Sequence, residues 1–305
     1  MNNSSIVLSS GDVVVLASYL CIGFTGIICN ILVIALIHTS KSLKSPCFQL
    51  ISGSAFGALT LSMFYFIGGI EVLGEWLGVF NLIRTRLHCL LIFGTCGIFG
   101  IAFHSFMTCI IGMDRLVSLI APIRYRNFGT RYVGVVISIC ALVVLTEEVT
   151  IFVLTPSNEL IECVAFGKAA HQGAHTVYTV LNFISGSASV VIYIAMACCF
   201  YIKRSKFQRG SSEQKSFMKQ QAAVMPTVKL LAVLSFVCCV LPEVIIGITT
   251  YLDQKSLAVG IVREMTNILK LGSTFMEFIS LVFCCKNFRD CLRAWLCRCK
   301  ATAAA

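Results

Sequence analysis

Charged residues and prolines are scarce in this sequence. Of its 305 residues, 12% are charged and five are proline, while 57% are apolar. Soluble domains carry about 25% charged residues, so the composition excludes an ordinary water-soluble protein and indicates one that lies in a lipid bilayer. The motifs His-Glu-x-x-His, Gly-x-Ser-x-Gly and Gly-x-x-x-x-Gly-Lys are also missing. Because these motifs mark zinc proteases, serine hydrolases and nucleotide-binding enzymes, we expect no enzyme activity, cofactor or resident metal.

Seven apolar stretches are each long enough to cross a bilayer, which takes about 20 helical residues. They are Val13–Ile37, Phe48–Ile70, Leu87–Ile120, Val133–Thr155, Thr176–Ile202, Thr227–Tyr251 and Thr266–Cys285. The segments between them are polar and too short for a separate soluble domain. The sequence therefore predicts an all-α membrane protein with an N-terminal segment (1–12), a seven-transmembrane helix bundle (13–285) and a C-terminal segment (286–305).

The distribution of lysine and arginine orients the bundle. With the N-terminus outside, 18 of the 24 lysines and arginines fall in the inner loops and the C-terminal segment, as the positive-inside rule requires. Two overlapping glycosylation sequons, at Asn2 and Asn3, then lie outside. The basic inner face suits anionic lipid and an intracellular protein partner and requires no nucleic acid. We expect a multi-pass protein of the plasma membrane.

Two of the seventeen cysteines face the oxidising side in this topology. They are Cys89, at the outer end of the third stretch, and Cys163, after the fourth. Extracellular cysteines are usually paired, so we predict a Cys89–Cys163 disulfide, with two free thiols as the alternative. On the inner side, Cys297 and Cys299 follow a short amphipathic stretch, 288–296. We expect a helix along the membrane surface there and candidate palmitoylation of both cysteines.

An acid and a base stand side by side at the inner end of the third stretch. Asp114-Arg115 is followed seven residues later by Pro122-Ile123-Arg124-Tyr125. Taken alone, this is an ordinary helix-end pair with Arg115 reaching to the membrane surface. Taken with the seven spans and Cys89, the combination resembles rhodopsin-like (class A) G-protein-coupled receptors. Within that class the sequence is similar to the nematode serpentine chemoreceptors of class SX and their close relatives.

Further matches spread this resemblance along the chain. Gly26 to Asn30 is similar to the first-span signature of the class, and Phe236 to Pro242 to the sixth-span signature. Asn287-Phe288-Arg289 resembles the start of its eighth, surface helix. Proline in the sixth span bends the helix, which gives its inner half a pivot.

The resemblance implies a receptor that binds an extracellular small molecule or short peptide. It would activate a heterotrimeric G protein by outward movement of the sixth helix, in the membrane of sensory cells. The implied G-protein contacts are Asp114, Arg115, Arg124, Tyr125, Arg126 and Tyr193. The implied switch residues in the bundle core are Asn30, Phe236, Pro242 and Glu277.

The sequence departs from the class in the centre of the bundle. The usual second-span Asp, which binds sodium, has no counterpart here, and the seventh span lacks Asn-Pro-x-x-Tyr. We therefore expect the switch to use another arrangement, around Glu277 with Asn30. No acid near the inner end of the sixth span is placed to hold Arg115, so only Asp114 remains. As an exposed pair, Asp114 and Arg115 would contribute about 0.2–1 kcal/mol, which predicts a weakly held resting state with appreciable basal signalling.

The outer half of the bundle holds the predicted ligand pocket. Its candidate residues are Cys96, Gly97, His175, Asn182, Val240, Glu243 and Lys270. Amine receptors carry an Asp where this chain has Cys96-Gly97, which argues against a monoamine ligand. Glu243 and Lys270 are expected to pair across the sixth and seventh helices, either as part of a ligand site or as a purely structural ion pair.

Two neighbouring acids in the fourth stretch allow two interpretations. Glu147 and Glu148 follow only 14 residues of that stretch, about 21 Å of helix, whereas the hydrocarbon core is about 30 Å thick. They either line the mouth of the pocket and favour a cationic ligand or, as we favour, mark a fourth helix that ends early.

Three other functions stay open. Lys270 permits a light-sensing, opsin-like receptor with a retinal Schiff base, although it is one residue off the opsin spacing relative to Glu277. The departures in the bundle centre permit a degenerate receptor that does not signal. A seven-helix transporter is the third, but the two matched, broken helices typical of inverted repeats are not evident.

Overall fold

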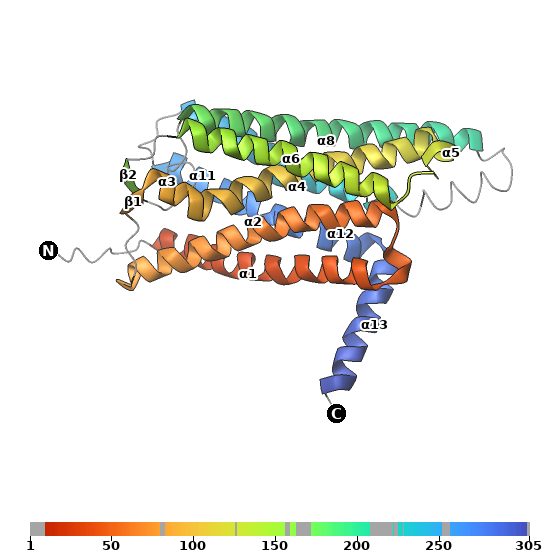
Figure 1. The fold of residues 1–305 in the computed structure, drawn as a ribbon, viewed down its shortest axis with the longest axis horizontal. Coiled ribbons are helices and arrows are strands. Elements are labelled where there is room, and N and C mark those ends of the chain that lie inside the picture. The colour runs from red at the N-terminus through yellow and green to blue at the C-terminus, as the bar shows by residue number, and fades with distance from the viewer. Residues whose placement is uncertain are drawn as a thin grey trace.

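The computed structural model is a bundle of long helices that run roughly parallel or antiparallel to one another (Figure 1). It describes residues 10–79, 83–125, 127–155, 159–162, 172–207, 222, 225–227, 229–251 and 257–303. The long helices include α1 (Ser10–Thr39), α2 (Pro46–Trp76), α4 (Thr95–Ile120), α6 (Thr130–Leu154) and α8 (Gln172–Phe207), with the short turn η1 (Lys41–Leu43) between α1 and α2.

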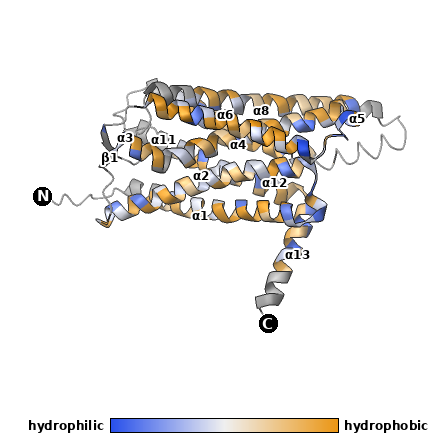
Figure 2. Cartoon of the chain, viewed as in Figure 1, coloured by the Kyte–Doolittle hydropathy of each residue, from blue (hydrophilic) through white to orange (hydrophobic). Residues whose placement is uncertain are grey.

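Six described helices are long and apolar enough to cross a membrane. They are Leu16–Thr39, Pro46–Trp76, Thr95–Ile120, Arg131–Leu154, Tyr178–Lys203 and Met225–Thr249. A seventh crossing is obtained when the bent pair Ile268–Cys284 and Lys286–Cys297 is counted as one span. Hydrophobic residues cover most of the helix length, and hydrophilic ones gather toward the helix ends (Figure 2). By helix length and composition, the predicted helical membrane bundle is confirmed.

The last membrane segment is broken in its middle. α11 (Leu257–Leu271) gives way to the 3-10 turn η4 (Gly272–Phe275), and α12 (Met276–Cys284) follows. Glycine and serine favour helix less than leucine does, and the Thr274 hydroxyl donates to the Leu271 carbonyl at 2.7 Å. The tighter turn interrupts the regular α-helical hydrogen bonds. It leaves the Thr274 carbonyl available to a side chain from another helix.

α13 (Lys286–Ala303) leaves the bundle at a bend of 96° (Figure 1). Phe288 is fully buried in the core beside α12. Arg289 Nη1 donates to the carbonyls of Val282 and Phe283 at 3.1 and 2.7 Å. These contacts satisfy carbonyls at the end of α12 that have no partner within the helix. α13 begins at the predicted start of the surface helix, and its contact with a membrane stays a prediction.

Two π turns interrupt other helices. η2 (Leu90–Gly94) joins α3 (Arg86–Cys89) to α4, and η3 (Phe236–Val240) precedes α10 (Leu241–Tyr251). η3 lies directly before Pro242, which has no N–H and whose ring crowds the carbonyl four residues earlier. The wider π turn accommodates this and rotates the residues before it relative to those after it.

A short antiparallel sheet closes one end of the bundle. Its strands are β1 (Ile83–Thr85) and β2 (Leu160–Glu162), with Ile83 opposite Glu162. Arg86 pairs with Glu159 at 2.8 Å beside it. The hydropathy pattern did not predict this sheet, because each strand has only three residues. We call this the strand end, and we name the opposite end the α5 end, after α5 (Pro122–Tyr125) (Figure 1).

The fourth helix does not end early, so the favoured interpretation of Glu147 and Glu148 is wrong. α6 continues to Leu154 because the residues after the two acids are mostly apolar and extend the helix. Glu148 is buried and Glu147 is partly buried. Neither acid lines the cavity described below.

α2 and α4 approach each other closely in the middle of the bundle. A Cβ atom on Gly57 of α2 would lie 2.8 Å from the backbone nitrogen of His104, and one on Gly100 of α4 would lie 2.6 Å from that of Leu61. Only glycine permits such contact, since real Cβ atoms do not come within 3.0 Å of a neighbour. This contact fixes the depth at which α2 and α4 present their polar side chains.

Candidate functional site

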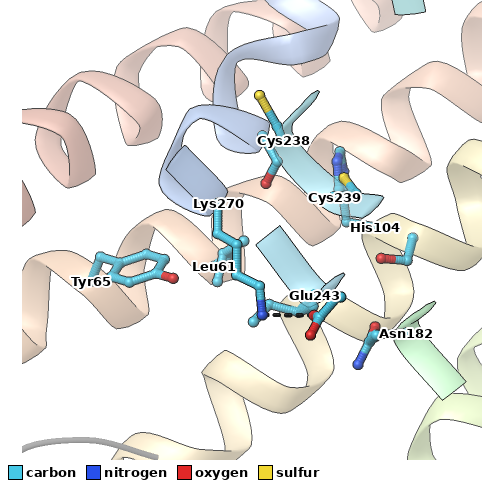
Figure 3. A pocket seen from close by; sticks show the side chains of 11 residues that line it. Leu61, Tyr65, His104, Asn182, Cys238, Cys239, Glu243 and Lys270 are labelled. Atoms are coloured by element: carbon cyan, nitrogen blue, oxygen red, sulfur yellow. Dashed lines mark ion pairs between the residues drawn. The ribbon is translucent and has the colours of Figure 1, made fainter. Parts of the chain in front are cut away.

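A small cavity of about 20 Å³ lies between the helices toward the strand end, and Figure 3 shows the side chains that line it. We call it the strand-end cavity. Its lining residues come from α2, α4, α8, η3, α10, α11 and η4. Of the five long helices named above, α1 and α6 do not contribute. They are Leu61, Tyr65, Ile101, His104, Ser105, Asn182, Cys238, Cys239, Glu243, Lys270 and Ser273.

The predicted pair between Glu243 and Lys270 is formed in this cavity (Figure 3). Lys270 Nζ lies 2.6 Å from Glu243 Oε1, and the two side chains are 16% and 5% exposed. The pair therefore places two opposite charges in the wall of the cavity.

Only some of the predicted pocket residues line the cavity. Asn182, Glu243 and Lys270 do, but Cys96, Gly97 and Val240 do not. Gly97 instead packs against the Phe64 ring, which a Cβ would meet at 3.0 Å. α4 is rotated so that its residues 101, 104 and 105 face the cavity. The side chain of His175 lies outside the described residues.

Three buried side chains from three helices meet beside this cavity, and one of them, His104, lines it. Ser54 of α2 donates its hydroxyl hydrogen to Glu277 Oε1 of α12 at 2.5 Å, and its Oγ lies 3.2 Å from His104 Nδ1 of α4. His104 Nδ1 is 3.4 Å from Glu277 Oε1. The exposed fractions are 0% for Ser54, 1% for His104 and 2% for Glu277. We call these residues the central triad.

Sequence reasoning found Glu277 but missed its two partners. A histidine within an apolar span was an available signal, because polar side chains at that depth are rare and need a partner. Ser54 carried no signal of its own, since α2 holds two other serines.

A second, smaller cavity, of about 10 Å³, lies beyond the triad toward the α5 end. We call it the α5-end cavity. Thr108, Tyr193, Thr227, Glu277 and Ser280 supply its polar lining. Because His104 lines the first cavity and Glu277 the second, the triad separates the two.

Asn30 holds the broken seventh segment. Its side chain is fully buried, and Nδ2 donates to the Thr274 carbonyl at 2.9 Å and to the Gly26 carbonyl at 2.8 Å. Asn30 therefore binds the backbone of η4 and not the carboxyl group of Glu277. Asn30 and Glu277 are therefore not in direct contact as expected. They are connected only by the short stretch of backbone from Thr274 to Glu277.

Phe236 does not lie in the bundle core, so its predicted placement there is wrong, while its role as a switch residue stays a prediction. Its side chain is 48% exposed, whereas Val240 and Pro242 are buried. The π turn that begins at Phe236 changes which residues face inward, and Cys238 and Cys239 line the cavity instead.

At the α5 end, three side chains form a compact polar cluster. Asp114 Oδ2 accepts hydrogen bonds from Arg115 Nε at 3.0 Å, from Arg115 Nη2 at 2.5 Å and from the Tyr125 hydroxyl at 3.0 Å. Arg115 Nη2 also donates to the Tyr125 hydroxyl. The Arg115 guanidinium lies 5.4 Å from the centre of the Tyr125 ring. Burial raises the pKa of Tyr125 above its ordinary value, so its phenol stays protonated and donates to Asp114.

This geometry corrects the predicted weak latch. Asp114 is 1% exposed and Arg115 is 9% exposed, so the pair is buried and not exposed. Tyr125 is a third partner, because α5 folds back beneath the end of α4 and brings the phenol to Asp114. Breaking a buried, hydrogen-bonded charge pair costs more than breaking a surface pair. Appreciable basal signalling therefore no longer follows from this cluster.

Two side chains of α8 bind backbone carbonyls of α4 near the α5 end. Lys203 of α8 donates to the Leu119 carbonyl at 2.7 Å and to the Ile120 carbonyl at 3.2 Å, which satisfies the end of α4. The Tyr193 hydroxyl donates to the Thr108 carbonyl at 3.0 Å. Tyr193 is 1% exposed and lines the α5-end cavity. Its contact here is thus with the backbone of α4 and not with Arg115.

The remaining predicted residues lie at the periphery or outside the described part. Arg124 and Cys297 are exposed. Cys89 is disulfide-bonded, and β2 ends one residue before Cys163. Outside the described residues lie Asn2, Asn3, Arg126, Cys163 and the side chain of Cys299.

The architecture and its polar groups lie within one known family. The family model described as serpentine type 7TM GPCR chemoreceptor Srsx matches residues 23–295. The chain belongs to the Srsx family. The match extends from within α1 into α13, so the strand-end cavity, the central triad and the Asp114–Arg115–Tyr125 cluster all lie inside it. A search of curated proteins gave no match.

Membership fixes the class of protein. Srsx proteins are serpentine seven-transmembrane chemoreceptors, a receptor family and not an enzyme family. This Srsx protein is accordingly a multi-pass membrane protein. A receptor of this kind has two partners in general, a ligand and a G protein.

Proposed function

We propose that this Srsx receptor is a plasma-membrane chemoreceptor of sensory cells. It binds an extracellular small molecule or short peptide in the strand-end cavity and activates a heterotrimeric G protein at the α5 end. This proposal places the N-terminus and the strand end outside the cell, on the basis of the lysine and arginine distribution. It also places α13 along the inner membrane surface as helix 8.

The observation that carries this proposal is the position of the sixth helix, Met225–Thr249. Cys238, Cys239 and Glu243 of this helix line the strand-end cavity, and Thr227 and Leu231 line the α5-end cavity. The π turn and Pro242 lie between these two sets of residues. A ligand that shifts Glu243 therefore acts on the same helix whose inner half closes the α5-end cavity.

Activation follows from this arrangement. Outward movement of the inner half of the sixth helix, with η3 and Pro242 as the pivot, opens the α5-end cavity to the intracellular side. The G protein then contacts Asp114, Arg115, Arg124, Tyr125, Arg126 and Tyr193. Arg115 becomes available to it once its bonds to Asp114 and Tyr125 break.

The cavity restricts the ligand. Its one described ion pair, Glu243 with Lys270, is neutral overall, and hydroxyl and amide groups of Tyr65, Ser105 and Asn182 surround it. These groups favour a small polar molecule, or the end of a short peptide, that is neutral or zwitterionic. A simple cation would leave Lys270 without its partner.

The test is a coupling assay in cells. We expect a screen of small metabolites, volatiles and short peptides to give ligand-dependent recruitment of a G protein. Arg115→Ala should abolish recruitment at matched surface expression, while Arg289→Ala, which alters a cap outside the cluster, should retain it. Recruitment that is unchanged in Arg115→Ala would contradict the proposal, as would ligand-dependent substrate flux without recruitment. A visible absorbance with 11-cis-retinal that Lys270→Ala removes would favour a light sensor instead.

A further inference from the structure

The central triad is the least expected polar group in this bundle. Ser54, His104 and Glu277 come from α2, α4 and α12, and each side chain is at most 2% exposed. Three distances join them: 2.5 Å between Ser54 Oγ and Glu277 Oε1, 3.2 Å between Ser54 Oγ and His104 Nδ1, and 3.4 Å between His104 Nδ1 and Glu277 Oε1. These contacts connect a pocket-lining residue to the last transmembrane segment.

Charge balance determines how many protons the triad holds. An ionised carboxylate without a cation is very costly in a buried site. The other buried cations nearby are committed, because Lys270 pairs with Glu243 and Arg115 pairs with Asp114. His104 is therefore the base that balances Glu277 in the described part of the chain. The pair is neutral either as imidazolium with carboxylate or as imidazole with carboxylic acid, and both forms hold one proton.

The pair has an unpartnered polar atom on each side. His104 Nε2 and Glu277 Oε2 are both buried and have no hydrogen-bond partner among the described residues. His104 lines the strand-end cavity, and Glu277 lines the α5-end cavity together with Ser280, whose hydroxyl also has no described partner. Each of the two residues thus keeps one unused polar atom and borders a different cavity.

The other titratable groups around the triad do not replace His104. Tyr193 of α8 and Cys239 of η3 lie within electrostatic reach of Glu277, but a phenol and a thiol supply no positive charge. Glu243 of α10 and Lys270 of α11 neutralise each other across the cavity. α1 and α2 present the neutral side chains of Asn30 and Ser54.

We propose that Ser54, His104 and Glu277 form a proton-binding site that holds one proton and exchanges it through the strand-end cavity. Ser54 positions the carboxylate by donating to Oε1, and His104 carries or shares the proton. Loss of the proton leaves a buried negative charge on Glu277, which weakens the packing of α12 against α2 and α4. The consequence for signalling, higher basal activity as the pH rises, rests on the receptor function proposed above.

The test is the thermal unfolding temperature of the purified receptor as a function of pH. Four proteins are compared: wild type, His104→Gln, Glu277→Gln and the double variant. The double variant removes both titrating groups and serves as the baseline for all other titrations in the chain. Each difference from that baseline reports only the triad.

The four proteins should show different slopes, because stability falls with pH wherever the folded state holds more protons than the unfolded state. In the unfolded chain, Glu releases its proton near pH about 4.3 and His near pH about 6.5. Between these two pH values, the unfolding temperature of wild type should run parallel to that of the double variant. Above about pH 6.5 it should fall relative to the double variant. His104→Gln should already fall from about pH 4.3 upward, because only a protonated Glu277 is neutral there.

Glu277→Gln should have the opposite slope. Its folded state keeps His104 neutral, whereas the unfolded chain takes up a proton below about pH 6.5, so its stability rises with pH up to that value. This variant keeps the test decisive even when His104→Gln does not fold. Slopes of wild type and Glu277→Gln that are both parallel to the double variant would overturn the proposal.

A second readout separates this proposal from the receptor function. Basal second-messenger level is measured in cells against external pH for wild type and the double variant, at equal surface expression. We expect a rise with pH in wild type that the double variant lacks. The predicted unfolding slopes without any G-protein coupling would reject the receptor function and keep the proton site. G-protein coupling together with unfolding slopes that match the double variant would reject the proton site and keep the receptor function.

Discussion

The Tyr125 hydroxyl donates to Asp114 Oδ2 at 3.0 Å, the same oxygen that accepts two hydrogen bonds from the neighbouring Arg115. Three donors thus converge on one carboxylate oxygen at the end of α4. The position of Tyr125 follows from Pro122, which starts α5 immediately after α4 ends and turns the chain back. Tyr125 therefore belongs to the group that holds Arg115 in the closed bundle.

Replacing Tyr125 with Phe should weaken this group without removing its charges. The ring and its contact with the Arg115 guanidinium are kept, while the hydrogen bond to Asp114 is lost. Hydrogen bonds to charged groups contribute about 1.5–3 kcal/mol. We expect a lower unfolding temperature of the purified protein and a several-fold rise in basal signalling in cells.

Tyr132→Phe is the matched control for that change. Tyr132 stacks on Phe128 with ring centres 4.7 Å apart, and its hydroxyl makes no hydrogen bond within the described part of the chain. This control should match wild type in both measurements. Equal basal signalling in Tyr125→Phe and Tyr132→Phe would remove Tyr125 from the group that holds Arg115.

Removing Lys270 should destabilise the bundle, because it leaves Glu243 buried without its partner. Breaking one side of a buried pair costs about 3–5 kcal/mol, and the 16% exposure of Lys270 reduces this figure through solvent screening. We expect Lys270→Met to lower the unfolding temperature and the exchanged pair Glu243→Lys with Lys270→Glu to recover part of the loss. No recovery in the exchanged pair would mean that the 2.6 Å contact contributes little.

Adding a methyl group to Gly57 should separate α2 from α4. Its Cβ would lie 2.8 Å from the His104 backbone nitrogen, and overpacking of this kind costs about 1–3 kcal/mol. Gly68→Ala on the same helix is the control, since a Cβ there meets nothing within 4 Å. Thermal unfolding should show a loss for Gly57→Ala and no loss for Gly68→Ala. A similar result for both would show that the close approach does not limit packing.

Cys89 should be linked to Cys163. Cys89 is the last residue of α3, which follows β1 directly, and β2, the strand paired with β1, ends at Glu162. Mass spectrometry of protease fragments should find a peptide that joins the two cysteines and separates on reduction. Cys163→Ser should leave Cys89 open to alkylation after unfolding in denaturant, because Cys89 is 1% exposed in the folded protein, and lower stability by about 2–4 kcal/mol. Alkylation of Cys89 in the unreduced wild-type protein, unfolded in denaturant, would contradict this pairing.

Sequence reasoning located the helices well and the breaks within them poorly. The predicted first stretch, Val13–Ile37, lies inside α1, and the predicted third stretch ends with α4 at Ile120. The predicted seventh stretch, Thr266–Cys285, gave no sign of η4, because a single 3-10 turn leaves the hydropathy of a span unchanged. The early end assigned to α6 failed for a related reason, since two acids do not stop a helix whose following residues are apolar.

Some residues of the candidate site could be found from the sequence, and others could not. Asp114, Arg115, Asn30 and Pro242 stood in recognisable motifs, and Glu243 with Lys270 stood out as charges in apolar spans. Phe236 stood in a motif too, but it faces outward because the π turn rotates that part of the helix. His104 and Ser54 belonged to no motif, and only their position beside Glu277 gives them a role.

The sequence by itself determined that this protein is a helical membrane bundle and a serpentine receptor, because long apolar runs and short local motifs are properties of neighbouring residues. Only the tertiary structure decided that Glu277 meets Ser54 and His104, that Asn30 binds the Thr274 carbonyl, and that Tyr125 turns a helix-end pair into a buried cluster of three. The reason is geometric. Hydropathy determines which segments enter the membrane. Which side chains touch depends on the rotation of each helix about its axis and on the close approach that glycines allow.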